Sequence, residues 1–205
     1  MTPVSPETIE LWGGSLCVDF VNSVDYDADD RPLPAHEALR APRDLARWAR
    51  RLEVSGGRGL LGISDDEFAA ALALRADLYG VLAAVARDER PPAAALARVM
   101  DAYAEATAAA RLTPGDGPGA APGWRLGWPA RDPRRVRFAV AADAVALLGD
   151  PARLARLRRC PGRDCGWLFL DTSGRRRWCS MGACGSREKM RRMYARRRSA
   201  TSQES

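Results

Sequence analysis

The chain has one histidine, His36, in 205 residues. A single imidazole does not supply the nitrogen ligands of a typical catalytic metal site, and no patterned serine or carboxylate set accompanies it to form a nucleophile–base pair. We therefore predict that the protein is not an enzyme. His36 is expected to lie at the surface or at the start of a helix.

Long apolar runs are absent, and residues 1–7 lack the basic start and apolar stretch of a signal peptide. These absences predict a cytoplasmic protein that makes no use of a membrane. Because the cytoplasm keeps thiols reduced, paired cysteines there favour metal binding over disulfides. Lysine is scarce too, since Lys189 is the only one among 32 basic residues. The preference for arginine therefore belongs to the whole chain and does not by itself indicate phosphate binding.

Acidic residues are scarce only in the last part of the chain. Residues 1–150 have 17 arginines and 22 acidic residues, a net charge of −5. Residues 151–205 have 15 basic and 4 acidic residues, a net charge of +11. This asymmetry predicts two functional units, of which only the second is attracted to a polyanion.

Four of the five cysteines form two CxxxxC pairs near the C-terminus, namely Cys160, Cys165, Cys179 and Cys184. Glycine and proline within and beside the pairs supply the turns that metal-binding loops need. Two loops with two thiolates each can close a tetrahedral site for one structural Zn²⁺ ion, and redox disulfides or an iron–sulfur site are the alternatives. The fifth cysteine, Cys17, lies in an apolar run and is expected to be a core residue.

Residues 1–150 have the patterns of a mostly helical domain. Apolar periodicity, Pro42 at a helix start, and a capping box in which Ser64 and Glu67 bond each other predict four helices, over residues 42–52, 64–88, 92–111 and 132–148. Residues 16–24 fit either a buried strand or the start of a helix. A loop is expected over 113–123, followed by a short strand at 124–128.

The C-terminal part is predicted to form a small metal-bound unit. A strand at 167–171, a turn, and a return segment at 175–178 would form a hairpin between the two cysteine pairs, as in a zinc ribbon. Ser186 is a suitable N-cap for a basic helix that follows. The fold class is thus α+β: a mostly helical N-terminal domain with a few short strands, a four-cysteine zinc-ribbon-like hairpin and a C-terminal basic helix. The expected units are 1–150, 151–198 and a disordered tail at 199–205.

A metal-fixed unit with this charge predicts binding to double-stranded DNA. The residues expected to contact phosphates and base edges are Arg175, Arg176, Arg177, Arg187, Lys189, Arg191, Arg192 and Arg196. Trp167 and Trp178 are expected to pack the unit rather than stack on bases. The alternative is an adaptor that binds RNA or protein without sequence-specific DNA recognition.

The sequence resembles a known family in two places. Residues 16–23, LCVDFVNS, resemble the opening motif of the ABATE domain, and residues 160–198, with FLDTS, RWCSM and CGSREK, resemble the CGNR zinc finger. The resemblance implies a bacterial transcription regulator that responds to stress, with the finger as its DNA-binding part. The family asparagine is replaced by Ser186: serine caps a helix about as well, but it cannot make the bidentate contact of asparagine with adenine. We favour the capping role.

Two further expectations concern regulation and assembly. Trp12, Phe20, Asn22 and Trp48 are candidates to line a pocket for a small-molecule effector, although aromatic residues of a helical domain more often belong to the core. Because a single finger covers little DNA, a homodimer formed through the helical domain is expected.

Overall fold

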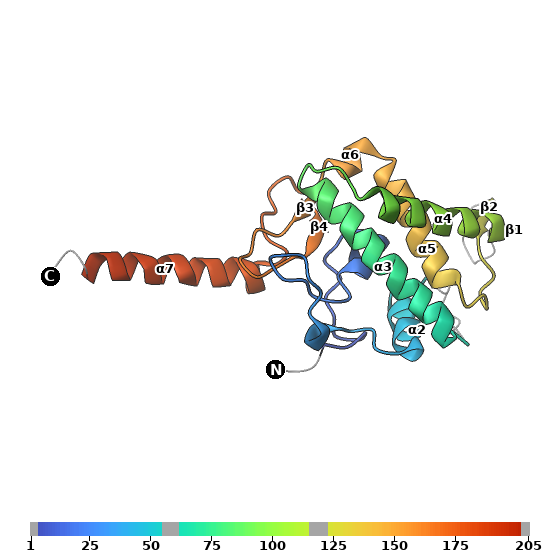
Figure 1. Cartoon of the computed structure of the whole chain (residues 1–205), viewed down its shortest axis with the longest axis horizontal. Coiled ribbons are helices and arrows are strands. Elements are labelled where there is room, and N and C mark those ends of the chain that lie inside the picture. Colours follow the sequence, from blue (N-terminus) through green and yellow to red (C-terminus); the bar gives the residue numbers. More distant parts are fainter. Residues whose placement is uncertain (1–3, 55–61, 115–122, 202–205) are drawn as a thin grey trace.

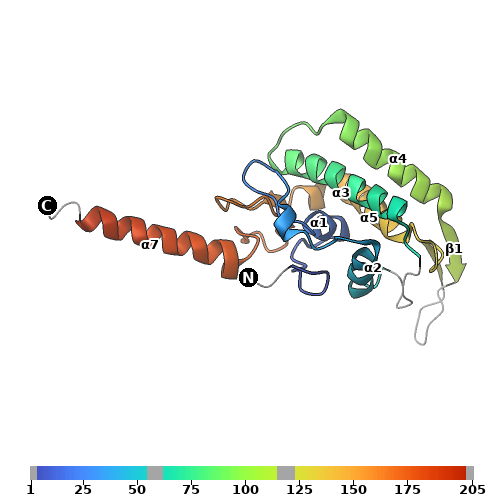
Figure 2. The same ribbon diagram turned by 60° about the horizontal axis from the view of Figure 1, so that its bottom comes forward.

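The computed structural model describes residues 4–54, 62–114 and 123–201. Helices dominate the described residues, with two short two-stranded sheets (Figure 1). The expected α+β class is confirmed. A helical body holds most of the chain, and one long helix at the C-terminal end projects away from it in both views (Figures 1 and 2).

Three long helices form the centre of the body: α3 (Asp65–Ala86), α4 (Ala93–Ala109) and α5 (Arg135–Leu148). They pack against one another, and the short helix α1 (Leu16–Val21) packs against α3 and α5. Together with neighbouring segments, these helices bury a continuous core, whose largest fully buried side chains include Trp48, Phe20, Leu78, Leu82 and Leu147.

The question left open for residues 16–24 is settled in favour of a helix, α1. Cys17 is fully buried there, which confirms its expected place in the core. Helix α2 (Pro42–Arg51) begins at the expected proline, and a short 3₁₀ helix (Pro34–His36) precedes it.

Only half of the expected capping box forms at the start of α3. The Ser64 hydroxyl accepts a hydrogen bond from the amide of Glu67 at 3.2 Å. The Glu67 carboxylate does not return to Ser64 but binds the guanidinium of Arg137 in α5 at 2.8 and 3.0 Å. Arg137 also bonds Glu105 of α4. A nearly buried guanidinium is stable only when carboxylates pair with it. The ion pairs of Arg137 join all three helices, and they stabilise the fold more than a second hydrogen bond of the capping box would.

Strand β2 (Trp124–Gly127) confirms the expected strand at 124–128, and its partner is β1 (Arg111–Pro114). The two are antiparallel, with Leu112 opposite Leu126. The expected loop at 113–123 therefore starts inside a strand, and its residues 115–122 lie outside the described residues. Just after α5, Asp150 and Pro151 begin the short helix α6 (Pro151–Leu154), where the Asp150 side chain accepts hydrogen bonds from two backbone amides.

The hairpin of the C-terminal unit differs from the expected one. Strand β4 (Leu168–Leu170) lies within the expected strand, but it pairs with β3 (Leu157–Arg159), which precedes the first cysteine pair. Residues 175–178 do not pair with it. The reason is burial: Leu157 and all of β4 are apolar and buried, whereas the arginine-rich return segment would place charge in that core.

Helix α3 reaches the length and hydropathy of a membrane-spanning segment, which corrects the reading that no apolar run approaches that length. Half of its most apolar stretch is buried inside the protein. Its apolar residues Leu78, Val81 and Leu82 are fully buried within the helical body, as expected for the central helix of a folded core.

The last helix follows the second cysteine pair without a break. A π-helical turn (η2, Met181–Gly185) leads directly into α7 (Ser186–Thr201). Apart from this turn, α7 projects from the body in both views (Figures 1 and 2). The helix continues past residue 198, where the tail was expected to begin, because no glycine or proline interrupts it. Residues 202–205 of that tail lie outside the described residues.

Candidate metal centre and basic helix

The structure brings together the four cysteines that the sequence paired. Their Sγ atoms all lie within 4.8 Å of one another, and all four side chains are buried. Cys165 and Cys179 are 3.9 Å apart between Sγ atoms, and Cys179 and Cys184 are 3.6 Å apart. Tetrahedral coordination at a zinc–sulfur distance of about 2.3 Å requires sulfurs roughly 3.8 Å apart. The cluster therefore fits one zinc ion closed on all sides, which is a structural rather than a catalytic arrangement.

The chemistry of the thiols points the same way. Hydrogen bonds with Cys165 and Cys179 lower the pKa of Cys160 to about 2. The hydrogen bond to that thiolate in turn raises the pKa of Cys165 to about 12 and raises the pKa of Cys179 as well. Four thiols this close cannot all ionise in the absence of a counter-charge, and a divalent cation supplies it.

The close packing of the sulfurs leaves no room for a side chain at Gly162. A Cβ atom at residue 162 would lie 3.0 Å from the Cys184 sulfur and 3.1 Å from Cβ of Cys165. Phe169, Trp167 and Trp178 pack around the cysteines and form a second, smaller core. The expected packing role of the two tryptophans is thus seen in the structure.

Several hydrogen bonds join the metal-binding unit to the helical body. The buried side chain of Asn22 donates to the carbonyl of Leu168 at 2.8 Å and accepts its amide at 3.1 Å, so it pairs with β4 as a neighbouring strand would. Gly166 donates to the carbonyl of Tyr26 at 2.8 Å, and a Cβ at residue 166 would lie 2.4 Å from the Tyr79 hydroxyl oxygen. Side-chain bonds of Arg159 to the loop around Asp30 add to this interface.

Arg176 is a structural residue in this arrangement. Its guanidinium donates to the carbonyls of Trp12 at 2.8 Å, Trp178 at 3.2 Å and Cys179 at 2.6 Å. It also lies 4.3 Å from the ring centre of Phe169. All three of its nitrogen atoms donate to carbonyls inside the protein, which gives the side chain a structural role, while its expected contact with DNA stays a prediction. The sequence offered no means of distinguishing it from its two neighbours.

Ser186 does not cap α7. The N-cap is Ser180, whose hydroxyl accepts the amides of Gly182 and Ala183 and so starts the π-helical turn. Ser186 already has helical backbone angles, and its hydroxyl donates to the carbonyl of Met181 at 2.8 Å. The preferred reading of this family substitution is therefore wrong, since the N-cap lies six residues earlier than the sequence suggested, at Ser180.

The remaining basic candidates form a basic surface around α7 and on the loop at residues 175–177. Their described side chains are largely exposed: Arg175, Arg177, Arg187, Lys189, Arg191 and Arg192. Glu188 pairs with both Arg191 and Arg192 at 3.0 Å. Arg196 lies on the same helix, but its side chain is outside the described residues. The surface is strongly positive even after the one acidic residue of the helix is counted.

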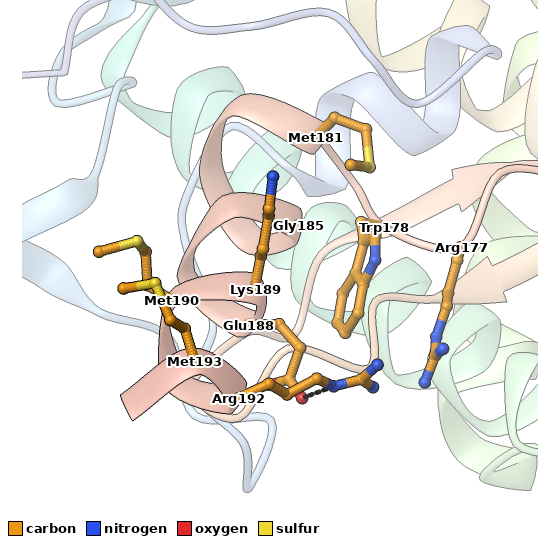
Figure 3. A pocket seen from close by; sticks show the side chains of 9 residues that line it. All are labelled: Arg177, Trp178, Met181, Gly185, Glu188, Lys189, Met190, Arg192 and Met193. Atoms are coloured by element: carbon orange, nitrogen blue, oxygen red, sulfur yellow. Dashed lines mark hydrogen bonds and ion pairs between the residues drawn. The ribbon is translucent and has the colours of Figure 1, made fainter. Parts of the chain in front are cut away.

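A groove runs between α7 and the loop at Arg177 and Trp178. Its volume is about 570 Å³. Figure 3 shows Trp178 between the Arg177 side chain and α7, with Arg192 and Glu188 below it and Lys189 on the helix. Methionines from the π-helical turn and α7 complete the lining. The groove thus has an apolar floor and a basic rim.

The four effector candidates do not surround one cavity. Phe20 and Trp48 are fully buried and pack on each other, with ring centres 5.2 Å apart. Asn22 is fully buried and pairs with β4 as described above. Trp12 alone lines a cavity, next to the metal-binding unit. Core packing, which periodicity cannot distinguish from pocket lining, accounts for the other aromatic side chains.

His36 is linked to the metal-binding unit through the carboxylate of Asp25. Its Nδ1 atom lies 2.6 Å from one oxygen of Asp25, whose other oxygen accepts the indole N–H of Trp167 at 2.5 Å. The sequence gave no signal for this contact, because it joins residues more than a hundred positions apart.

A helical domain with a structural four-cysteine zinc site and a protruding basic helix defines the class of zinc-finger proteins. The model of the ABATE family, described as "Putative stress-induced transcription regulator", matches residues 14–151, and the CGNR zinc finger matches residues 156–197. The chain therefore belongs to the ABATE family and carries a CGNR zinc finger, as its motifs indicated. Neither is an enzyme family. No curated protein gives a significant match to the chain.

Proposed function

We propose that the protein is a cytoplasmic transcription regulator that binds double-stranded DNA through its zinc finger and α7, and that it catalyses no reaction. The observation that carries this proposal is the basic groove beside α7. Its floor is apolar and its rim positive, which matches the sugar-phosphate backbone of one DNA strand.

The geometry supports an entry of α7 into the major groove. An α-helix fits that groove, and α7 protrudes from the body with exposed side chains (Figures 1 and 2). Arg177, on the loop opposite, would then face the backbone of the strand that borders the groove. Its guanidinium already lies over the Trp178 ring at 5.1 Å, which fixes its direction.

The zinc ion contributes by ordering this surface. Cys179 and Cys184 flank the segment that starts α7, while Cys160 and Cys165 lie beside β3 and β4, which pack on the body. One ion bound by all four thiolates therefore fixes α7 relative to the rest of the chain. Loss of the ion would leave the basic segment as a loose tail.

Salt dependence tests the proposal. Six described basic side chains that contact phosphates would make log affinity fall with a slope of about −5 against log salt, or roughly 10³-fold between 50 and 200 mM. Replacing Arg177 or Lys189 with alanine should weaken binding and reduce the slope by about 0.9 each. Arg43→Ala, an exposed arginine on α2, is the control and should leave the slope unchanged. Fluorescence anisotropy with labelled duplex DNA measures both quantities.

Two results would contradict the proposal. One is an unchanged slope in both finger variants. The other is competition in which single-stranded RNA or heparin displaces duplex DNA of a defined promoter at physiological salt. The second result would favour the alternative, an RNA- or protein-binding adaptor.

We further propose a homodimer formed through the helical body. The β1–β2 hairpin has exposed apolar side chains on Leu112, Trp124 and Leu126, with exposed fractions of 64% to 70%. Because Leu112 lies opposite Leu126, and Trp124 is two residues from Leu126, all three share one face of the hairpin. A second copy covering this face would provide two fingers and a two-part DNA site. Trp124→Ser should yield a monomer in sedimentation, and a wild-type monomer on and off DNA would refute the dimer.

A further inference from the structure

A second cavity lies where the metal-binding unit meets the N-terminal segment. Its volume is about 330 Å³, within the range of small-molecule sites. One side is formed by Trp12, Tyr26 and Leu33, and the other by Trp167 and by residues of the metal-binding unit, namely Cys165, Cys179, Ala183 and Cys184. Neither unit forms this cavity alone.

The walls of this junction cavity suit a flat apolar group. Trp12 and Trp167 are partly exposed in it, with ring centres 6.1 Å apart and planes at 57°. At this distance the two indoles pack on each other, and a third aromatic ring in the cavity can pack against the sides of the two rings that line it. The hydrogen bond from Trp167 to Asp25 holds one of these indoles in place.

The charges of the junction cavity favour a cation. Three carboxylates line it, from Glu10, Asp25 and Asp164, against the single guanidinium of Arg187 and the imidazole of His36. Cys165, Cys179 and Cys184 line it too, and a site of four thiolates with one Zn²⁺ ion keeps a net negative charge. Arg187 is itself directed to a cysteine, since its guanidinium lies 3.6 Å from the Cys184 sulfur. The carboxylate of Asp25 is held in place, because each of its oxygens has one hydrogen-bond partner. Each oxygen can accept one more hydrogen bond, for example from a ligand.

We propose that the junction cavity is a binding site for a small aromatic amine. The ring would pack against Trp12 and Trp167, and the ammonium group would face Asp25 and Glu10. An ammonium group near an indole face gains a cation–π contribution in addition to its pairing with carboxylates. The site does not depend on DNA binding, and its test uses no DNA.

Two probes of equal shape and opposite charge test the site. Phenethylamine and 3-phenylpropionate share the phenyl ring and two-carbon chain, and differ in carrying an ammonium or a carboxylate group. Titration calorimetry of the zinc-loaded full chain should show that phenethylamine binds at least about tenfold more tightly, the ratio that corresponds to about 1.4 kcal/mol. Trp12→Ala should weaken that binding at least about tenfold, and Glu10→Gln should weaken it about threefold or more. Met100→Ala shortens an exposed apolar side chain on α4 that does not line the junction cavity, and should leave binding unchanged.

Zinc content and melting temperature, measured for each variant, show whether it is folded. If Trp12→Ala is unfolded, Glu10→Gln decides, because Glu10 is an exposed residue. Equal affinity for the two probes, no binding of phenethylamine, or binding unaltered in a folded Trp12→Ala or Glu10→Gln variant would overturn the proposal.

Discussion

Arg176 offers a sharp test of how the finger is built. It lies between two exposed arginines, and a sequence reading assigns all three to DNA. The structure instead directs its guanidinium to the carbonyls of Trp12, Trp178 and Cys179. We predict that Arg176→Ala destabilises the protein, whereas Arg175→Ala does not.

The size of the effect follows from the bonds lost. Hydrogen bonds that involve a charged group contribute about 1.5–3 kcal/mol each, and three are removed. Arg176 is partly exposed, so water can replace part of what is lost, and we expect a net cost of about 3 kcal/mol. For a protein of this size this corresponds to a melting temperature lower by roughly 6–12 °C.

Thermal melts of zinc-loaded protein measure the stability, and a colorimetric zinc chelator measures how fast the metal is released. Arg176→Ala should melt earlier and release zinc faster, because the bond to Cys179 is lost. Arg175→Ala should match the wild type in both assays but bind DNA more weakly. The reasoning is refuted if Arg176→Ala keeps wild-type stability and loses DNA affinity as Arg175→Ala does.

Three other predictions follow from particular contacts. Burial raises the pKa of Asp19 to about 6, so the proton on this carboxyl stabilises the fold below about pH 4, and that stabilisation is lost as pH rises through 6. Asp19→Asn should therefore remove a fall in stability of up to about 3 kcal/mol between pH 4 and 7, measured by urea denaturation, and an unchanged pH profile would contradict this. Cys160→Ser should lose zinc and DNA binding while α3 to α5 remain folded by circular dichroism; a variant that still retards duplex DNA would be inconsistent with it. Arg137→Ala should cost about 3–5 kcal/mol, because Glu67 and Glu105 lose their buried partner, and a change in melting temperature below about 3 °C would argue against that role.

Much of the helical body was predictable because its signals are local. Pro42 begins α2 and Ser64 caps α3, each through contacts within one turn of chain. The metal site was predictable for a related reason. The spacing of the cysteines, the turns beside them and the reducing compartment expected for the protein all favour the same ion.

Contacts between distant segments were not predictable. The β3–β4 pairing depends on which segment has an apolar face to bury, and Glu67 leaves its cap for Arg137 seventy residues away. Arg176 resembles its neighbours until its backbone partners are known. The role of Ser186 was misjudged because a π-helical turn precedes α7 and moves the N-cap to Ser180.

In the proposed function, a bound zinc ion fixes α7 as a rigid surface for DNA. Selection of bound fragments from random duplex DNA, with zinc-loaded protein and with protein stripped by a chelator, tests this directly. We predict a defined consensus sequence for the zinc-loaded protein and none after the metal is removed. A consensus that survives complete removal of zinc, or no enrichment by the zinc-loaded protein, would contradict the account.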